Sequence, residues 1–260
     1  MAQRENQPRV LIVGAGPTGL TAAVELARRG LVADIFEKQE AASHLSRAVG
    51  ILPSSMNLLS PSGVADAIRH EAIAYRAVVF HDEDKVIARL NLNEAEDVGY
   101  RLFGLAQDRA ETHLRIAFES MGGHVRYATE LTRLTQEESS VRATTGNDSA
   151  VYEHVIGADG VDSTVRHALG IDFHGHTLAG KWSIADIDCH DWPTPNEFHG
   201  YLRSAGRIVV VAPLESTRFR IVSNTEHALA TPPISPVESP RVASMAMTMR
   251  AIRPGGKPSP

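Results

Sequence analysis

The first forty residues show the clearest pattern of apolar and polar positions. Residues 10–13 are all apolar and mostly β-branched, which predicts a strand buried on both faces. Over residues 18–29, apolar side chains recur at positions 20, 24 and 27, the spacing of one helical face. Gly30 favours an end to that helix, and residues 32–36 again predict a buried strand. These segments form a β-α-β unit, so we expect a parallel sheet with a right-handed crossover.

The rest of the chain predicts two more long helices and many strands, with no internal repeat. The helical pattern covers residues 56–70 and 109–121. Strands are expected at residues 77–80, 85–92, 124–127, 129–135, 141–143, 151–156, 182–187, 208–211 and 218–222. Residues 231–260 differ, because they hold seven of the fourteen prolines and one acid, Glu238. Such a segment buries too little apolar surface to offset its ordering entropy, and we expect a loose tail.

Composition and charge narrow the class of protein. Hydrophobic residues make up 43% and charged residues 22% of 260, an ordinary globular mix for one large domain or two interleaved ones. The net charge of −5 argues against a nucleic-acid partner bound by phosphate neutralisation. The single cysteine, Cys189, cannot form an intrachain disulfide, and no apolar run approaches 18 residues. We therefore expect a cytoplasmic protein that binds neither nucleic acid nor membrane.

The turn after the first strand has the spacing G-x-G-x-x-G, with Gly14, Gly16 and Gly19. In this context the first glycine allows a tight turn, the second lets a pyrophosphate approach the backbone, and the third lets helix and strand pack closely. The phosphates would then face the free N–H groups at the start of the helix. Glu37 ends the second strand, where an acid can bind ribose hydroxyls. The pattern predicts a dinucleotide site and leaves FAD and NAD open, beside the alternative of a plain glycine turn with a surface acid.

A second polar cluster, residues 157–166, follows another predicted strand. Asp162 or Ser163 is a good N-cap for a helix that runs to residue 169. Gly160 leaves room for a close approach, and Arg166 could pair with Asp159 or with a ligand phosphate. From the residues alone, a capped turn with a structural ion pair explains the cluster as well as a ligand site does.

The order of these motifs resembles the FAD-dependent aromatic hydroxylases, the class A flavoprotein monooxygenases typified by para-hydroxybenzoate hydroxylase and its polyketide-modifying relatives. The resemblance covers residues 8–225. The segments that carry it are residues 14–19, Glu37-Lys38, the stretch Ser46-Arg47-Ala-Val-Gly-Ile, Gln107 ahead of a helix, and residues 157–166. The order and spacing of the set are far more specific than any one motif.

The resemblance implies a role in cofactor binding for each matching residue. The three glycines of the first motif would lie at the FAD pyrophosphate, and Glu37, followed by Lys38, at the adenosine ribose. Arg47 and Gln107 would reach the pyrophosphate and the ribityl chain, and Leu131 would lie beside the adenine.

The second motif has its own implied role. Asp159, Gly160 and Arg166 would form the fingerprint shared by FAD and the nicotinamide cofactor. No residue is assigned as a catalytic acid or base, because in this family the flavin carries out the oxygen transfer.

The same resemblance implies an α/β fold in which a Rossmann-like FAD-binding domain is interleaved with a smaller β-rich substrate domain. The FAD-binding domain is expected at residues 1–75 and 101–178, the substrate sheet at 76–100 and 179–230, and the loose tail at 231–260. The implied activity is hydroxylation of an aromatic or polyketide-like small molecule with FAD, molecular oxygen, and NADH or NADPH as reductant.

One family feature is not found in this sequence. Family members carry a third fingerprint, Gly-Asp-Ala-x-His, and the chain contains no Gly-Asp dipeptide. We therefore expect that the C-terminal part of the family is lacking here, through truncation, a frame change or divergence. The alternatives to a working hydroxylase are a non-catalytic flavin-binding remnant, a subunit that needs a partner chain, and a simple NAD dehydrogenase. No metal site is expected, because His174 and His176 have no third ligand at a recognisable spacing.

Overall fold

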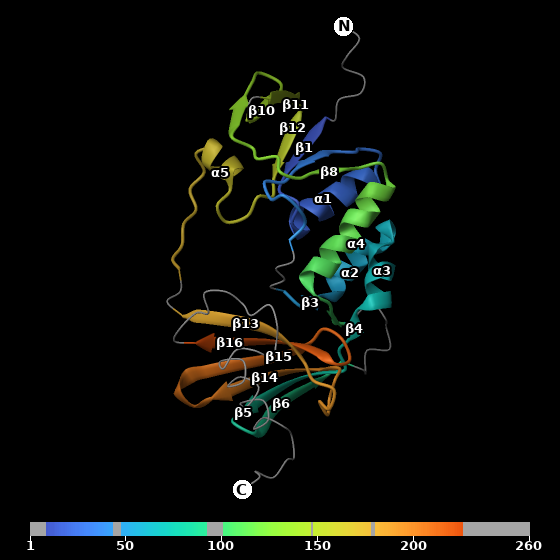
Figure 1. Ribbon diagram of the computed structural model, residues 1–260, viewed down its shortest axis with the longest axis vertical. Helices are drawn as coiled ribbons and strands as arrows, with labels where there is room; N and C mark the ends of the chain where they lie inside the picture. The colour runs from blue at the N-terminus through green and yellow to red at the C-terminus, as the bar shows by residue number, and fades with distance from the viewer. Residues whose placement is uncertain (1–8, 44–47, 93–100, 147, 178–179, 226–260) are drawn as a thin grey trace. The chain divides into compact units, whose positions relative to one another are not determined.

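The computed structural model describes residues 9–43, 48–92, 101–146, 148–177 and 180–225 (Figure 1). The chain divides into two compact units that alternate along the sequence. Unit 1 comprises residues 1–46, 59–67 and 107–175, and unit 2 comprises residues 47–58, 68–106 and 176–260. Arg47 and the expected tail at 231–260 lie outside the described residues.

A four-stranded parallel sheet forms the centre of unit 1. Its strand order is β12-β1-β2-β8, with β1 at Val10–Val13 between its two neighbours. The other three strands are β2 at Asp34–Phe36, β8 at Val125–Arg126 and β12 at His154–Gly157. All four residues of β1 are buried, as the apolar run predicts for a central strand. The predicted β-α-β unit and the α/β class are confirmed.

Two helices of unit 1 pack against each other beside this sheet (Figure 1). Helix α1 spans Pro17–Ala27 and buries an apolar face that includes Leu20 and Val24. Helix α4 spans Gln107–Ser120 and buries Leu114 and Phe118. The predicted apolar spacing of both helices is therefore the spacing of their buried faces.

An antiparallel ribbon and a short helix complete unit 1. The ribbon consists of β9 (Arg133–Gln136), β10 (Val141–Thr145) and β11 (Asp148–Tyr152), and the helix is α5 (Thr164–Ala168). The Tyr152 hydroxyl donates to an Asp34 carboxylate oxygen at 2.8 Å, which joins the ribbon to β2. Leu131 and Val165 pack with residues of β1, β2 and the ribbon in one apolar cluster.

Three expected elements are wrong in extent. The single helix at 56–70 is two helices, α2 (Pro53–Leu59) and α3 (Val64–Glu71), joined by the 3₁₀ turn Ser60–Ser62. Pro61 has no N–H to donate and Gly63 adopts a left-handed φ of 77°, so the helix cannot continue there.

The other two errors concern strands. The strand expected at 151–156 is two strands, because the Arg9 carbonyl accepts from the N–H groups of Glu153 and His154 and turns the chain from β11 into β12. The strand expected at 129–135 begins only at Arg133, and residues 129–131 form a loop.

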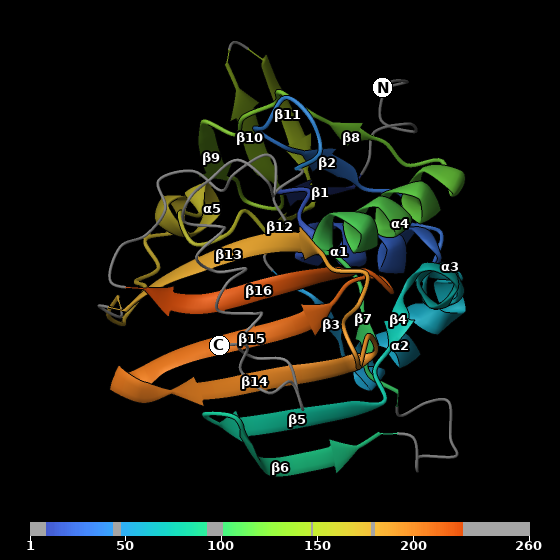
Figure 2. The same cartoon turned by 60° about the horizontal axis from the view of Figure 1, so that its bottom comes forward.

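Unit 2 is built on a six-stranded sheet in the order β13-β16-β15-β14-β5-β6 (Figure 2). The strands are β13 (Lys181–Asp188), β16 (Arg218–Thr225), β15 (Arg207–Pro213), β14 (Glu197–Arg203), β5 (Ala77–Asp82) and β6 (Lys85–Asn91). The pairing of β5 with β14 is parallel, and every other pairing is antiparallel. A smaller sheet joins β3 (Gly50–Ile51), β7 (Phe103–Gly104) and β4 (Ile73–Ala74).

One strand of the six-stranded sheet, β14, was not expected from the apolar pattern. Its glycine, Gly200, interrupts the run, and a Cβ placed there would lie 2.9 Å from the ring of Phe80 on β5. The glycine is therefore required by a partner strand far away in sequence, which a local pattern cannot reveal.

A buried histidine pair lies on one face of the sheet of unit 2. His81 Nε2 and His199 Nδ1 share a hydrogen bond of 3.0 Å, and His199 Nε2 lies 2.8 Å from the Thr194 hydroxyl. The His81 ring stacks on Tyr201 with centroids 4.3 Å apart. Burial lowers the pKa of both histidines, and that of His199 falls to about 4. The pair is therefore neutral in the folded protein near pH 7.

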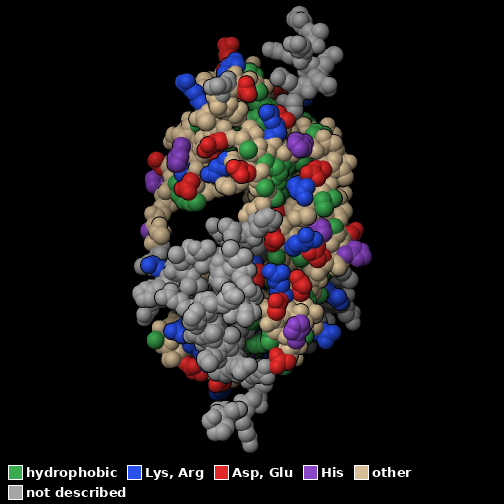
Figure 3. Space-filling model, viewed as in Figure 1, with side chains coloured by type: hydrophobic (Ala, Val, Ile, Leu, Met, Phe, Trp, Pro, Cys, Tyr) green, Lys and Arg blue, Asp and Glu red, His purple; other side chains and the backbone are tan. Residues whose placement is uncertain are grey.

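On the face drawn in Figure 3, the described basic and acidic side chains are interspersed rather than gathered by sign. Within the described part of the chain, no helix is long and apolar enough to cross a membrane. Over the same residues, no group of three or more His, Cys, Asp or Glu side chains is arranged to hold a metal ion.

Candidate functional site

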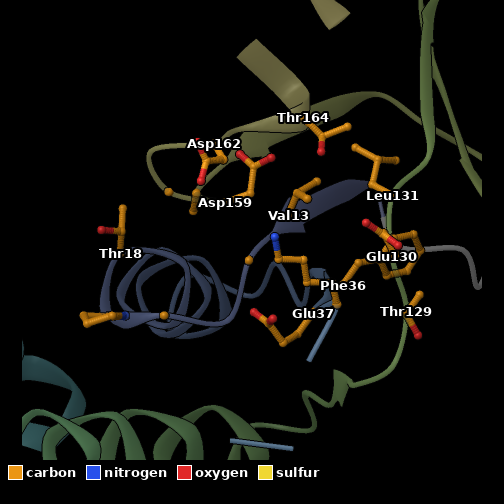
Figure 4. Close-up of a pocket in the computed structure, with 16 residues that line it drawn as sticks. Val13, Thr18, Phe36, Glu37, Thr129, Glu130, Leu131, Asp159, Asp162 and Thr164 are labelled. Atoms are coloured by element: carbon orange, nitrogen blue, oxygen red, sulfur yellow. The ribbon is translucent and has the colours of Figure 1, made fainter. Parts of the chain in front are cut away.

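A cleft of about 330 Å³ lies in unit 1 at the carboxyl end of β1. Figure 4 shows that its lining comes from four segments, at residues 13–18, 36–38, 129–131 and 158–164. The first two segments follow neighbouring parallel strands, and in open α/β sheets ligands bind beyond the carboxyl ends of such strands. The fold therefore places the predicted glycine motif in a ligand-sized concavity.

The three glycines of the motif have different steric surroundings. Gly14 has a φ of 100°, and a Cβ there would lie 2.4 Å from the Ala158 carbonyl oxygen. A Cβ on Gly19 would lie 1.9 Å from the Gly14 carbonyl oxygen, so the start of α1 can approach the turn only without a side chain. A Cβ on Gly16 would meet no atom within 4 Å. Gly14 and Gly19 are thus required by the protein itself, whereas Gly16 leaves open space for a ligand.

The N-terminus of α1 faces this open space. Gly16 is the N-cap and Pro17 the first helical residue, and no described side chain caps the helix. The first intrahelical bond runs from Leu20 N–H to Gly16 O, so the N–H groups of Thr18 and Gly19 precede it. Free N–H groups and the positive end of the helix dipole favour an anion such as a pyrophosphate.

Glu37 is held rigidly at the edge of the cleft. One carboxylate oxygen accepts the Ala15 N–H at 2.8 Å and the other accepts the Gln39 N–H at 2.9 Å. Each carboxylate oxygen has a second lone pair, so both can still accept a ligand hydroxyl. Lys38 lines the cleft beside it, and Leu131, buried to 4% exposure, forms an apolar wall. This combination suits a ribose next to a flat aromatic base.

The Asp159 loop forms the remaining wall, and its contacts differ from one expectation. The Asp159 carboxylate accepts the Ser163 hydroxyl and, at 3.2 Å, the Val165 N–H. The Arg166 guanidinium donates instead to the Val161 carbonyl and lies over the Phe173 ring. The suggested Asp159–Arg166 ion pair is therefore not formed. An Asp whose two oxygens accept donors from the start of α5 does not need the arginine to hold the loop.

Ser163, not Asp162, is the N-cap of α5, because its hydroxyl accepts the Arg166 N–H at 3.0 Å. Gly160 lines the cleft with a φ of 85° and open space where a Cβ would be. The loop is therefore shaped by its own hydrogen bonds and still leaves room for a ligand next to Gly160.

Three predicted residues, Gly19, Gln107 and Arg166, are not among those that line the cleft, and Gly19 instead lets α1 pack against the turn at Gly14. Gln107 is the first residue of α4, and its Nε2 donates to Glu111 Oε1 at 2.8 Å. Arg166 lies on α5 with the contacts given above. Among the residues that the sequence did not single out are Thr18, Thr129, Glu130 and Thr164, which all line the cleft. Thr18 lies inside the glycine motif, whereas Thr129 and Glu130 belong to a loop that only the family resemblance, through Leu131, had placed at this site.

Comparison with known proteins identifies the family. Residues 7–242 match the family model described as FAD binding domain. The chain belongs to this FAD-binding family. The predicted resemblance to FAD-dependent aromatic hydroxylases is confirmed, and FAD is the cofactor of the family.

Three similar proteins illustrate the relationship. Aklavinone 12-hydroxylase from Streptomyces peucetius subsp. caesius is 36% identical over 200 residues, which are 69% of this chain and 41% of that protein. Dialkyldecalin synthase from Streptomyces rugosporus is 28% identical over 86% of this chain and 47% of its own length. The crystal structure of p-nitrophenol 4-monooxygenase from Pseudomonas putida DLL-E4 superimposes with a TM-score of 0.76 at 23% identity, over 96% of this chain and 64% of that one. The structural match shows the shared fold, and this chain spans less than half the length of the two curated relatives.

Proposed function

We propose that unit 1 is the FAD-binding domain and that its cleft holds the ADP part of the cofactor. The open space at Gly16, facing the N-terminus of α1, carries this proposal. Thr18 and Gly19 N–H would bind the pyrophosphate, Glu37 the ribose hydroxyls, and the Leu131 wall the adenine. Gly160 would admit the cofactor beside Asp159. Lys38, Arg47, Gln107 and Arg166 complete the proposed set of cofactor-binding residues.

Unit 2 is, in the same proposal, the substrate-binding domain. The register of its sheet puts Phe80, Trp182 and Leu202 on the face that also carries Arg220. These three large apolar side chains are 45–47% exposed, whereas the opposite face carries the buried His81, His199 and Phe219. Exposed aromatic and aliphatic groups on one sheet face suit a flat aromatic substrate.

The activity that fits both units is hydroxylation of an aromatic or polyketide-like molecule with NADH or NADPH and molecular oxygen. Bound FAD would supply the electron transfer and oxygen activation. The residues of this chain would bind and orient. The N–H groups at Thr18 and Gly19 neutralise phosphate charge, Glu37 fixes the ribose, and the apolar face of unit 2 keeps water from the substrate. No side chain of the chain is assigned as an acid or a base.

A titration with FAD and with NAD tests the cofactor assignment. We expect FAD to bind more tightly, and Glu37→Ala to weaken FAD binding by about 1.5–3 kcal/mol, as for a lost charge-assisted hydrogen bond. Glu40→Ala, an exposed acid three residues further on, is the matched control and should change nothing. Tighter binding of NAD would overturn the proposal.

A second measurement tests the activity. Oxidation of NADH and NADPH is followed with FAD and a panel of phenols and polyketide-like aromatics, and hydroxylated product is identified by mass. Product that carries one added oxygen atom per NAD(P)H supports the proposal. FAD binding without any NAD(P)H oxidation would favour a non-catalytic flavin-binding chain, or one that needs a partner chain.

A further inference from the structure

A second cleft, of about 500 Å³, lies in unit 2 where β4 runs into β5. Every described residue of its lining belongs to unit 2, so it is distinct from the cleft of unit 1. Its volume is typical of small-molecule sites in proteins. The sheet-face residues Phe80, Trp182 and Leu202 are not part of its lining, so the face proposed for the substrate does not account for it.

Backbone pairing brings two arginines to this cleft. The short strands β4 and β7 are antiparallel, and beyond β4 the Tyr75 N–H donates to the Leu102 carbonyl at 3.0 Å. One residue further along each of the two segments stand Arg76 and Arg101. Both line the cleft, so the chain places two positive charges in one concavity.

The backbone of Arg76 is fixed on both sides, whereas its side chain is exposed. The Arg76 N–H donates to the Asn196 carbonyl at 2.9 Å, and the Arg76 carbonyl accepts the Leu92 N–H at 2.8 Å. These bonds hold the start of β5 between its neighbours and do not involve the guanidinium. A substitution of the side chain therefore leaves the sheet pairing in place.

No described group neutralises the two charges. Among the residues that the structure describes, neither Arg76 nor Arg101 forms an ion pair or a side-chain hydrogen bond, and no Asp or Glu lines the cleft. Arg89 of the same unit, in contrast, has Glu197 at 2.6 Å. Like charges that face each other on neighbouring segments destabilise a sheet, so stability does not explain why both arginines are here.

The rest of the lining adds hydrogen-bond donors and an apolar wall. Asn196 and Ser216 carry an amide and a hydroxyl that can donate to an anion. Ile73, Leu92 and Pro195 are apolar. A site with two guanidiniums, further donors and an apolar side suits a ligand that joins an anionic group to an apolar body.

We propose that this cleft binds a small organic anion, whose carboxylate or phosphate group lies between the guanidiniums of Arg76 and Arg101. Both anionic groups have several oxygen acceptors, which guanidinium binds through paired N–H donors. The apolar body of the ligand contacts Ile73 and Pro195. The site does not depend on bound FAD, so the inference stands or falls apart from the proposed function.

The test measures binding to the full chain by calorimetry with three matched probes: 2-naphthoate, 2-naphthyl phosphate and the neutral 2-naphthylmethanol. At least one anion should bind about ten-fold more tightly than the alcohol, and the tighter of the two identifies the anionic group. Arg76→Gln and Arg101→Gln should each weaken that binding by about five-fold, as for one lost charge-assisted hydrogen bond. Arg207→Gln, an exposed arginine of unit 2 outside the cleft, is the matched control and should leave the affinity unchanged.

Urea unfolding of each variant checks that the fold is intact, because the midpoints should equal that of the unsubstituted chain. Equal binding of the alcohol and the anions would overturn the inference, since it would show that charge has no part in recognition. An unchanged affinity in either cleft variant, or the same loss in Arg207→Gln, would overturn it too. So would the absence of binding of both anions at about 1 mM.

Discussion

The buried histidine pair of unit 2 makes its stability depend on pH in a calculable way. His199 is 2% exposed, and burial together with the neighbouring His81 lowers its pKa from 6.5 to about 4. The groups that act on it are His81, Thr194, Glu197, Arg89, the Tyr201 ring and the edge of Trp192. The perturbation is a fall in pH from 7.5 to 5.0.

The sign follows from where the proton binds. Between pH 6.5 and 4 an unfolded chain protonates His199 and the folded protein does not, so protons favour unfolding in this window. The contribution of neutral His199 to the unfolding free energy is fully present above pH 6.5 and is lost as the pH falls toward 4. A pH of 5.0 is 1.5 units below the ordinary pKa of 6.5 that His199 has in the unfolded chain. This difference corresponds to about 2 kcal/mol of lost unfolding free energy. His81, whose pKa is also lowered, adds to the loss.

Urea unfolding at pH 7.5 and at pH 5.0 measures this effect. Trp192, whose ring centroid is 5.9 Å from that of His199, supplies a fluorescence signal close to the pair. His199→Gln lowers the free energy of unfolding at both pH values. The further decrease from pH 7.5 to pH 5.0 should, however, be about 2 kcal/mol smaller in this variant than in the unsubstituted protein. His190→Gln, an exposed histidine of the same unit, is the control and should leave the pH dependence unchanged. An equal loss in His199→Gln and in the unsubstituted protein would refute the reasoning.

Three further predictions concern stability. Gly14→Ala should lower the unfolding free energy by more than about 2 kcal/mol in a denaturant titration, because the new Cβ would clash with the Ala158 carbonyl oxygen at a positive φ. Gly30 has a positive φ but no atom near its Cβ position, so Gly30→Ala should cost only about 1 kcal/mol. Arg220→Ala should cost about 3 kcal/mol of unfolding free energy, because Arg220 Nε donates to the Asp186 carboxylate at 2.7 Å and its side chain is 3% exposed. The Arg218 side chain is half-exposed, so Arg218→Ala should cost under 1 kcal/mol. Equal losses in the two variants would contradict the argument. Ser163→Ala removes the N-cap of α5 and should cost about 1 kcal/mol in thermal or denaturant unfolding, and no change would show that the cap contributes nothing.

The parts of the fold that the sequence predicted are those decided by near neighbours. The strand at 10–13, the glycine turn and the helix after it are contiguous, and burial on both faces of β1 shows directly as an unbroken apolar run. A polar N-cap at the start of α5 could be predicted from neighbouring residues, but the sequence left Asp162 and Ser163 open, and the structure identifies Ser163.

What the sequence could not predict depends on distant partners. Glu130 lines the cleft only because the loop after β8 returns to the end of β1, and no local pattern records that path. Nothing in the sequence around His199 indicates that it is buried, because its burial follows from the pairing of β14 with β5. The same pairing explains why Gly200 marks a close approach to Phe80 and not a turn.

The parallel pairing of β5 with β14 also sets an order of events during protein synthesis. Ala77 leaves the ribosome long before its partner Glu197, and the whole of residues 107–175 is made in between. At about 5–20 residues per second, the β5-β6 hairpin waits on the order of ten seconds with one edge unpaired. An unpaired edge is a template for association with other chains, so this hairpin is exposed to such association until β14 is made.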